Sequence, residues 1–180
     1  ARLAISNTFA CGCERCRRLD PVEWYKNMIM AMYKPFRDAG KKLVVRDFIY
    51  SKEEQERFKT AFNAMPDEIG LSLKNTPHDF YPTFPNNPLM GQVGNHPQIT
   101  EYDVNGQFYG WGAIPSTMLK DIRERLRYGS EHNVTGFIAR TDWEGVQDYT
   151  CFDNLNMLNL YAIAAYAENP EVREEDIYLK

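Results

Sequence analysis

The sequence predicts an α/β fold in which parallel strands alternate with helices. Four short apolar runs each end at polar, mostly charged, residues, as buried parallel strands do when their carboxyl ends open into a site. The segments between these runs carry helical periodicity or helix-start signals, so the order strand, loop, helix recurs about five times. The four runs cover residues 43–45, 69–73, 98–100 and 134–139.

The first half of the chain is expected to contain three strands and two helices. Asp20 and Pro21 provide the N-cap and the first position of the first helix, and Gly40 ends it. Residues 51–54 read Ser-Lys-Glu-Glu, a capping box that starts the second helix. The expected strands are residues 1–6, 42–49 and 68–74, and the expected helices are residues 21–39 and 51–65.

The second half is expected to contain two strands and two helices, with unequal connections. Long loops rich in Gly, Pro and aromatic residues follow the strands, whereas the connections after helices are short. This asymmetry is characteristic of a TIM-type (β/α)8 barrel, whose strand-to-helix loops build the active face. Five units are too few to close eight strands, so we expect residues 1–180 to form one partial barrel domain of a longer chain. The expected strands are residues 96–102 and 134–140, the helices 115–130 and 154–168, and the long loops 75–94 and 103–114.

Composition argues against two classes of partner. The length of 180 residues and a hydrophobic content of 43% fit one domain with a core. A net charge of −4 gives no electrostatic footprint for nucleic acid, and no stretch approaches the roughly 18 apolar residues of a membrane span. We therefore expect neither nucleic acid nor membrane as partner. A homodimer is compatible with the sequence, and a cytoplasmic location is slightly favoured over secretion.

Two carboxylates at successive strand ends are the leading catalytic candidates. Asp79 follows the third expected strand and Glu101 ends the fourth, so adjacent barrel strands would bring both to one rim. Glycoside hydrolysis needs such paired carboxylates. The alternative is that each caps a loop or pairs with a neighbouring Arg. Weaker candidates of the same type are Asp47, Asp103, Asp142 and Glu144.

Cations and aromatic rings lie in the same regions. Arg46 and Arg140 end strands and could hold a carboxylate-bearing substrate, or form ion pairs with those same acids. His78 is the one histidine at a strand end beside an acid. Trp111 and other loop aromatics could stack on sugars, or could cover the core. These aromatics are Phe80, Tyr81, Phe84, Phe108, Tyr109, Trp111 and Trp143.

The four cysteines leave three alternatives open. Cys11, Cys13 and Cys16 form a Cys-x-Cys-x-x-Cys cluster, and Cys151 lies in the last strand-to-helix loop. Together they could bind zinc, remain thiols or form at least one disulfide. The cluster spacing is less specific than two separated Cys-x-x-Cys pairs, so we expect no metal and no cofactor.

Three stretches, in order along the chain, resemble one enzyme family. They are residues 45–51 (VRDFIYS), 73–80 (LKNTPHDF) and 98–102 (QITEY), and the ending from Gly136-Phe137 to residues 169–172 (NPEV) and 174–177 (EEDI) is also similar. Together they resemble the catalytic barrel of family 67 glycoside hydrolases, the xylan α-glucuronidases. The resemblance implies a (β/α)8 barrel of which this chain covers about the C-terminal five units.

The resemblance also implies roles for individual residues. Asp79 matches the family's Asp, and Glu101 is the nearest match to its Glu, with Asp103 as the fallback. In the family these two acids activate the water that inverts the anomeric centre. Arg46 matches an Arg that helps hold the uronate carboxylate. The full set of expected substrate-binding residues is Asn7, Arg46, Lys74, His78, Trp111, Arg140 and Asp142.

Two positions depart from the family pattern. Phe9 stands where the family has its general acid Glu, and Ile5 replaces a Lys that helps bind the uronate. Glu14, in the loop beyond, could supply the acid. The expectation is therefore an inverting α-glucuronidase-type hydrolase acting on hemicellulose-like or uronic-acid-bearing glycans, as in xylan degradation. The alternatives are a non-catalytic glycan-binding barrel, which Phe9 favours, and a metal-dependent barrel enzyme that uses the Cys cluster.

Overall fold

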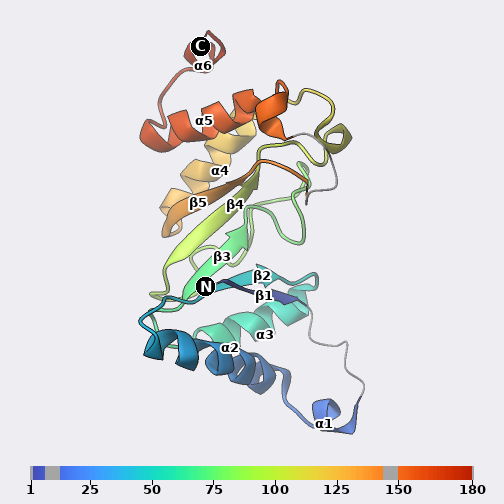
Figure 1. Cartoon of the computed structure of the whole chain (residues 1–180), viewed down its shortest axis with the longest axis vertical. Helices are drawn as coiled ribbons and strands as arrows, with labels where there is room; N and C mark the ends of the chain where they lie inside the picture. Colours follow the sequence, from blue (N-terminus) through green and yellow to red (C-terminus); the bar gives the residue numbers. More distant parts are fainter. Residues whose placement is uncertain (1, 7–12, 144–149, 180) are drawn as a thin grey trace.

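The computed structural model describes residues 2–6, 13–143 and 150–179, which form an α/β structure around one parallel sheet (Figure 1). No helix in these ranges is long and apolar enough to cross a membrane. The strands are β1 (Arg2–Ser6), β2 (Val44–Phe48), β3 (Gly70–Lys74), β4 (Gln98–Asp103) and β5 (Val134–Arg140). The helices are α1 (Glu14–Arg17), α2 (Pro21–Asp38), α3 (Lys52–Phe62), α4 (Leu119–Glu131), α5 (Met157–Glu168) and α6 (Glu174–Tyr178), with 3₁₀ turns η1 (Gly110–Gly112) and η2 (Cys151–Asp153).

The five strands lie in the sheet in their order along the chain. The spatial order is β1-β2-β3-β4-β5, and every neighbouring pair is parallel. Doubly wound sheets reverse their strand order at a switch point, where they bind ligands. The five described strands contain no such reversal, so each new strand is added at the same edge.

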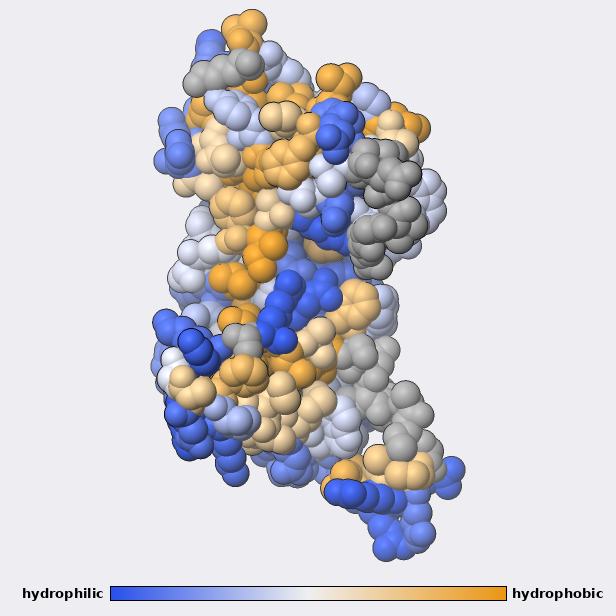
Figure 2. Space-filling view, in the orientation of Figure 1, coloured by the Kyte–Doolittle hydropathy of each residue, from blue (hydrophilic) through white to orange (hydrophobic). Residues whose placement is uncertain are grey.

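The helices cover one face of this sheet with two apolar clusters. Leu71 and Leu73 of β3 pack with Ile29 of α2 and with the rest of the first cluster, which holds α2 and α3 against β1 to β3. Tyr102 of β4 belongs to the second cluster, which holds α4 and α5 against β4 and β5. In Figure 1, α4 accordingly lies behind β4 and β5. None of the described helices covers the opposite face of the sheet, and hydrophilic side chains gather in the hollow across it (Figure 2).

Local sequence signals correctly predicted the starts of α2 and α3. Asp20 Oδ1 accepts hydrogen bonds from the backbone N–H of Val22 at 2.9 Å, and Ser51 Oγ accepts one from Glu54 N at 3.2 Å. In a capping box the Glu54 carboxylate would also accept from the backbone N–H of Ser51. Here that carboxylate is buried and accepts from the Tyr25 hydroxyl at 2.9 Å. Glu54 therefore ties α3 to α2.

Long-range hydrogen bonds shift the start of α4 away from the expected Pro115. Ser116 N donates to Asn156 Oδ1 at 2.7 Å, and Met118 N donates to Asn159 Oδ1 at 3.0 Å. The backbone N–H groups of Ser116 and Met118 thus have hydrogen-bond acceptors without being part of a helix. Helix α4 begins only at Leu119. Helix α5 likewise begins at residue 157 rather than 154, after the η2 turn. The short helices α1 and α6 were not expected from the sequence.

The long loop after β3 is well anchored to the rest of the molecule. Arg125 of α4 donates to the Phe84 carbonyl oxygen at 2.8 Å and to Asn86 Oδ1 at 3.1 Å. Leu89, Met90 and Val93 from the same loop lie in the first apolar cluster. The loop is therefore part of the folded body, and its residues 75–80 are held against the carboxyl ends of the strands.

Candidate functional site

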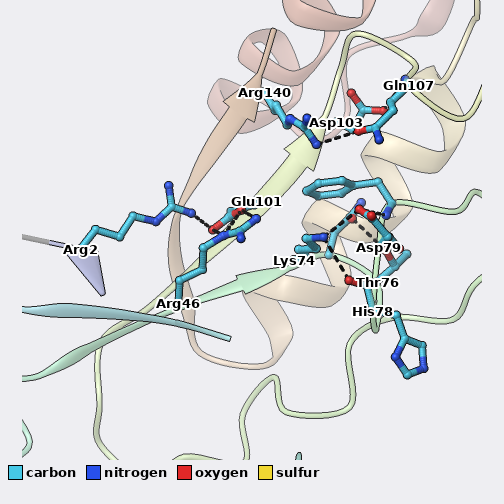
Figure 3. A network of polar contacts seen from close by, with 12 residues as sticks. Arg2, Arg46, Lys74, Thr76, His78, Asp79, Glu101, Asp103, Gln107 and Arg140 are labelled. Atoms are coloured by element: carbon cyan, nitrogen blue, oxygen red, sulfur yellow. Dashed lines mark hydrogen bonds and ion pairs between the residues drawn. The ribbon is translucent and has the colours of Figure 1, made fainter. Parts of the chain in front are cut away.

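The helix-free face of the sheet carries a group of charged side chains near the carboxyl ends of β2 to β5 (Figure 3). Paired residues on neighbouring parallel strands point to the same face. The pairs Arg46–Ser72, Lys74–Glu101 and Asp103–Arg140 therefore converge there. We call the following residues the charged cluster: Arg2, Arg46, Ser72, Lys74, Asp79, Glu101, Asp103, Gln107 and Arg140.

The negative charge of Glu101 is compensated by two neighbouring arginines. Arg46 Nε lies 2.9 Å from both carboxylate oxygens, Arg46 Nη2 lies 2.8 Å from Oε2, and the Arg2 guanidinium pairs with Oε1. The Ser72 hydroxyl donates to Oε1 at 2.6 Å. Burial would raise the pKa of Glu101, but the hydrogen bonds from Arg46 and Ser72 and the two guanidinium charges outweigh it and hold this pKa below its ordinary value. Glu101 is therefore a firmly ionised partner for cations.

Lys74 and Asp79 form a second ion pair beside it. Lys74 Nζ donates to Asp79 Oδ1 at 2.7 Å and to the His78 carbonyl oxygen at 3.0 Å. Burial lowers the pKa of Lys74 despite the Asp79 charge. Asp79 Oδ1 also accepts from the backbone N–H of Phe80 at 3.0 Å. This carboxylate is thus fixed in position, and it lies on the same side of the sheet as Glu101 (Figure 3).

Two phenylalanine rings line the ammonium group of Lys74. Its Nζ lies 3.9 Å from the centre of the Phe48 ring and 4.9 Å from that of Phe80. The Arg140 guanidinium lies 5.6 Å from the same Phe80 ring. Cations are attracted to aromatic faces at these distances. Phe80 therefore connects the Lys74–Asp79 pair to Arg140 and Asp103.

Asp103 is the least satisfied carboxylate of the charged cluster. Its Oδ2 accepts from the backbone N–H of Gln107 at 2.7 Å, and Gln107 Oε1 accepts from Arg140 Nη1 at 2.7 Å. Its Oδ1 is buried and has no hydrogen-bond partner within the described ranges. Burial raises the pKa of Asp103 to about 6, against the backbone hydrogen bonds and the Arg140 charge that lower it. A carboxylate of this kind can accept a proton near neutral pH.

Asp103 also borders a small pocket. The pocket has a volume of about 20 Å³, which is enough for one water molecule. Its lining includes Asn75, Phe80, Tyr109 and Arg125 in addition to Asp103. A larger cavity of about 290 Å³ lies beside β5, α4 and α5, but its lining residues include no carboxylate. The small pocket therefore places a water-sized space beside Asp103.

The structure brings most of the expected site residues together, but not all. Lys74, Asp79, Glu101 and the two strand-end arginines belong to the charged cluster. The His78 ring points away from it in Figure 3 and stacks on Tyr50 at 6.0 Å between ring centres. Asp142 follows β5 and is half-buried. Trp111 lies in η1 and packs against Trp143 with a tilt between the rings. Asn7, Phe9, Cys11 and Glu144 lie outside the described residues.

Asp47, a weaker candidate, belongs to the other face of the sheet. It neighbours Arg46 along β2, and successive strand residues point to opposite faces. Its carboxylate accepts from Ile49 N at 3.0 Å and from Gln55 Nε2 at 2.8 Å, beneath α3. Burial raises its pKa to about 6. The role of Asp47 is therefore to join β2 to α3.

Sequence reasoning missed three members of the charged cluster. Arg2, Ser72 and Gln107 were not singled out. Ser72 carried a usable signal, because it is a polar residue inside an apolar run and stands two positions before Lys74, on the same face. Arg2 and Gln107 carried no comparable signal, since their roles depend on partners from distant strands.

The described cysteines do not gather at one site. Cys13 and Cys16 belong to the α1 region, whereas Cys151 lies in η2, at the opposite end of the molecule (Figure 1). Cys151 is buried, and burial raises its pKa to about 11. Within the described residues, no group of three or more His, Cys, Asp or Glu side chains is arranged to hold a metal ion. A common zinc site, one of the three alternatives for the cysteines, is not formed by these three residues.

No protein-family model matches this sequence, and no curated protein matches it.

Proposed function

We propose that the chain is part of an inverting glycoside hydrolase of the α-glucuronidase type, acting on uronic-acid-bearing glycans, with Asp103 as the base that activates water. The fold in this proposal is a (β/α)8 barrel to which residues 1–180 contribute five units. The sequential parallel order of β1 to β5 supports it, because a barrel adds each strand at the same edge. The family resemblance of residues 45–51, 73–80 and 98–102 supports the substrate class.

The single observation that carries the choice of base is the state of Asp103. Glu101 is held ionised by two arginines, and its proton affinity is low. Asp103 has a buried Oδ1 without a hydrogen-bond partner in the described part of the chain, and it borders a pocket that fits one water. In the proposed step, Asp103 takes a proton from water while the water oxygen bonds to the anomeric carbon. The glycosidic C–O bond breaks with its electron pair going to the leaving oxygen, which takes a proton from solvent.

The charge balance of the cluster favours an anionic substrate. Four cations face three carboxylates: Arg2, Arg46, Lys74 and Arg140 against Asp79, Glu101 and Asp103. The Nε and Nη2 atoms of Arg46 are occupied by Glu101, which corresponds to the alternative role expected for this arginine. The Arg2 side chain is 43% exposed and is the more accessible contact for a uronate carboxylate.

The proposal assigns no general acid among the described residues. Glu14, the expected replacement for the acid at position 9, is exposed in α1 and pairs with Arg18. Helix α1 lies at one end of the molecule, away from the charged cluster (Figure 1).

Hydrolysis of 4-O-methylglucuronoxylan oligosaccharides, followed by NMR of the released sugar, tests the proposal. We expect release of the uronic acid with inverted anomeric configuration, and a loss of at least about 100-fold in the Asp103→Asn variant. The control is Asp67→Asn, in an exposed loop before β3, which should keep the parent rate. No release by the parent chain, or an unchanged rate in Asp103→Asn, would contradict the proposal.

A non-catalytic glycan-binding barrel is the second candidate. The exposed Trp111, with 54% of its surface accessible, favours this alternative. Binding of the same oligosaccharides without any hydrolysis would establish it in place of the hydrolase.

A further inference from the structure

Trp111 adopts a backbone conformation that bulky residues rarely adopt. Its φ is 61° and its ψ is 24°, in the left-handed region, between Gly110 at φ 67° and Gly112 at φ 76°. Bulky side chains in this region signal a turn under strain, and such strain concentrates at functional sites. A glycine at position 111 would form the same turn without that strain.

Buried asparagines enforce this conformation. Asn156 is fully buried and donates from Nδ2 to the carbonyl oxygens of Gly112 at 3.1 Å and Asn105 at 2.9 Å. The N–H of Gly112 donates to the Gly106 carbonyl oxygen at 3.0 Å. A Cβ on Gly112 would stand 2.4 Å from Asn105 Nδ2, so the chain packs tightly at this point. These contacts fix the backbone on both sides of Trp111, whose side chain is left 54% exposed.

The indole of Trp111 forms a pair with that of Trp143. The ring centres lie 4.3 Å apart, with an angle of 36° between the planes. The two rings come from the loops after β4 and β5, and Trp111 remains 54% exposed. Neither Trp belongs to the two apolar clusters. We call this pair the Trp platform, and packing of the core does not account for it.

The loops that carry the Trp platform also carry the charged cluster. Asp103 ends β4 and accepts from Gln107 N within the loop that leads to Trp111. Arg140 ends β5, three residues before Trp143. Both features therefore lie at the carboxyl edge of the sheet. A chain-like ligand that enters the charged cluster can extend over the Trp platform.

We propose that the Trp platform is a binding subsite for a neutral pyranose ring of a glycan chain. The apolar face of the ring would stack on Trp111, which offers a large rigid surface at low entropic cost. This inference rests on the proposed function for the class of ligand. It adds that a neutral backbone sugar of the oligosaccharide contributes to binding apart from the uronate, through Trp111.

Affinity electrophoresis in gels that contain neutral β-1,4-xylan, glucuronoxylan or no polysaccharide tests the subsite without requiring catalysis. Trp111→Gly removes the ring and keeps the left-handed turn, so loss of folding is not expected. It should bind both polysaccharides about tenfold more weakly than the parent, the factor for losing roughly 60 Å² of apolar contact. Trp143→Ala should also weaken binding, and Trp111→Phe should retain most of it.

The matched control is Tyr178→Ala, an exposed aromatic residue in α6. Its affinity should equal that of the parent. The subsite would be overturned if neither polysaccharide slowed the migration of the parent chain. It would also be overturned if the Trp111→Gly variant were slowed as much as the parent. If the platform variants lose binding while the parent shows no hydrolysis, the subsite stands and the proposed function fails. If the parent hydrolyses glucuronoxylan and the platform variants bind it normally, the proposed function stands alone.

Discussion

Replacing Asp103 by Asn should stabilise the protein, and by an amount that depends on pH. Burial raises the pKa of Asp103 from an ordinary 3.8 to about 6. At 1.36 kcal/mol per pKa unit, ionising this group is about 3 kcal/mol more costly in the folded chain than in the unfolded one. The side chain at position 103 thus favours folding below pH 3.8, and this advantage is lost as the pH rises through 6. An Asn keeps an oxygen that can accept from Gln107 N, and it carries no charge.

Urea unfolding of the parent and of Asp103→Asn at pH 4, 5, 6 and 7.5 measures the effect. The variant should gain about 2 to 3 kcal/mol relative to the parent between pH 4 and pH 7.5. Contributions from Asp47, whose pKa is also raised, cancel in this difference. A constant offset between the two proteins at all four pH values would refute the argument. The control Asp67→Asn, with an exposed carboxylate, should follow the parent throughout.

Three further variants test contacts that hold the site together. Arg46→Gln should lower the free energy of unfolding, measured in urea, by about 2 to 3 kcal/mol, because buried Glu101 loses its bidentate partner. In the double variant with Glu101→Gln, most of this loss should disappear. Asn156→Ala should lower it by about 3 kcal/mol or more, since several buried backbone groups lose a partner, and a small change in thermal midpoint would disprove this. Arg125→Gln should speed proteolysis within residues 82–86 by about tenfold, and Arg125→Lys should not restore protection because one ammonium cannot replace the planar guanidinium.

The sequence was sufficient where local chemistry decides the structure. The helix starts at Asp20 and Ser51 depend on side chains two or three residues from the backbone groups they bind, and both were predicted correctly. The strand ends were also found, because the change from apolar to charged residues marks them. The start of α4 was wrong, since the amides of Asn156 and Asn159 that displace it come from about 40 residues away.

The site was predictable in part. Alternation along β2 could have shown that Arg46 and Asp47 face opposite sides of the sheet, so only one of them can enter the site. Alternation places Glu101 and Asp103 on the same side of the sheet, so it cannot show which of the two carboxylates has the higher proton affinity. Their proton affinities differ because Arg2 and Arg46 arrive from other strands and pair with Glu101 alone. Such partners become visible only when the strands are placed side by side.

The two separate apolar clusters have a consequence for how the molecule opens. Segments held by different clusters exchange their amide hydrogens as different cooperative units, each with its own opening free energy. The boundary between the clusters runs between β3 and β4, so Arg46 and Lys74 of the charged cluster lie on one side of it and Glu101 and Asp103 on the other. A ligand that contacts both sides would bind only the closed form. It would therefore slow hydrogen exchange in β4, β5, α4 and α5 far more than its own contact area suggests.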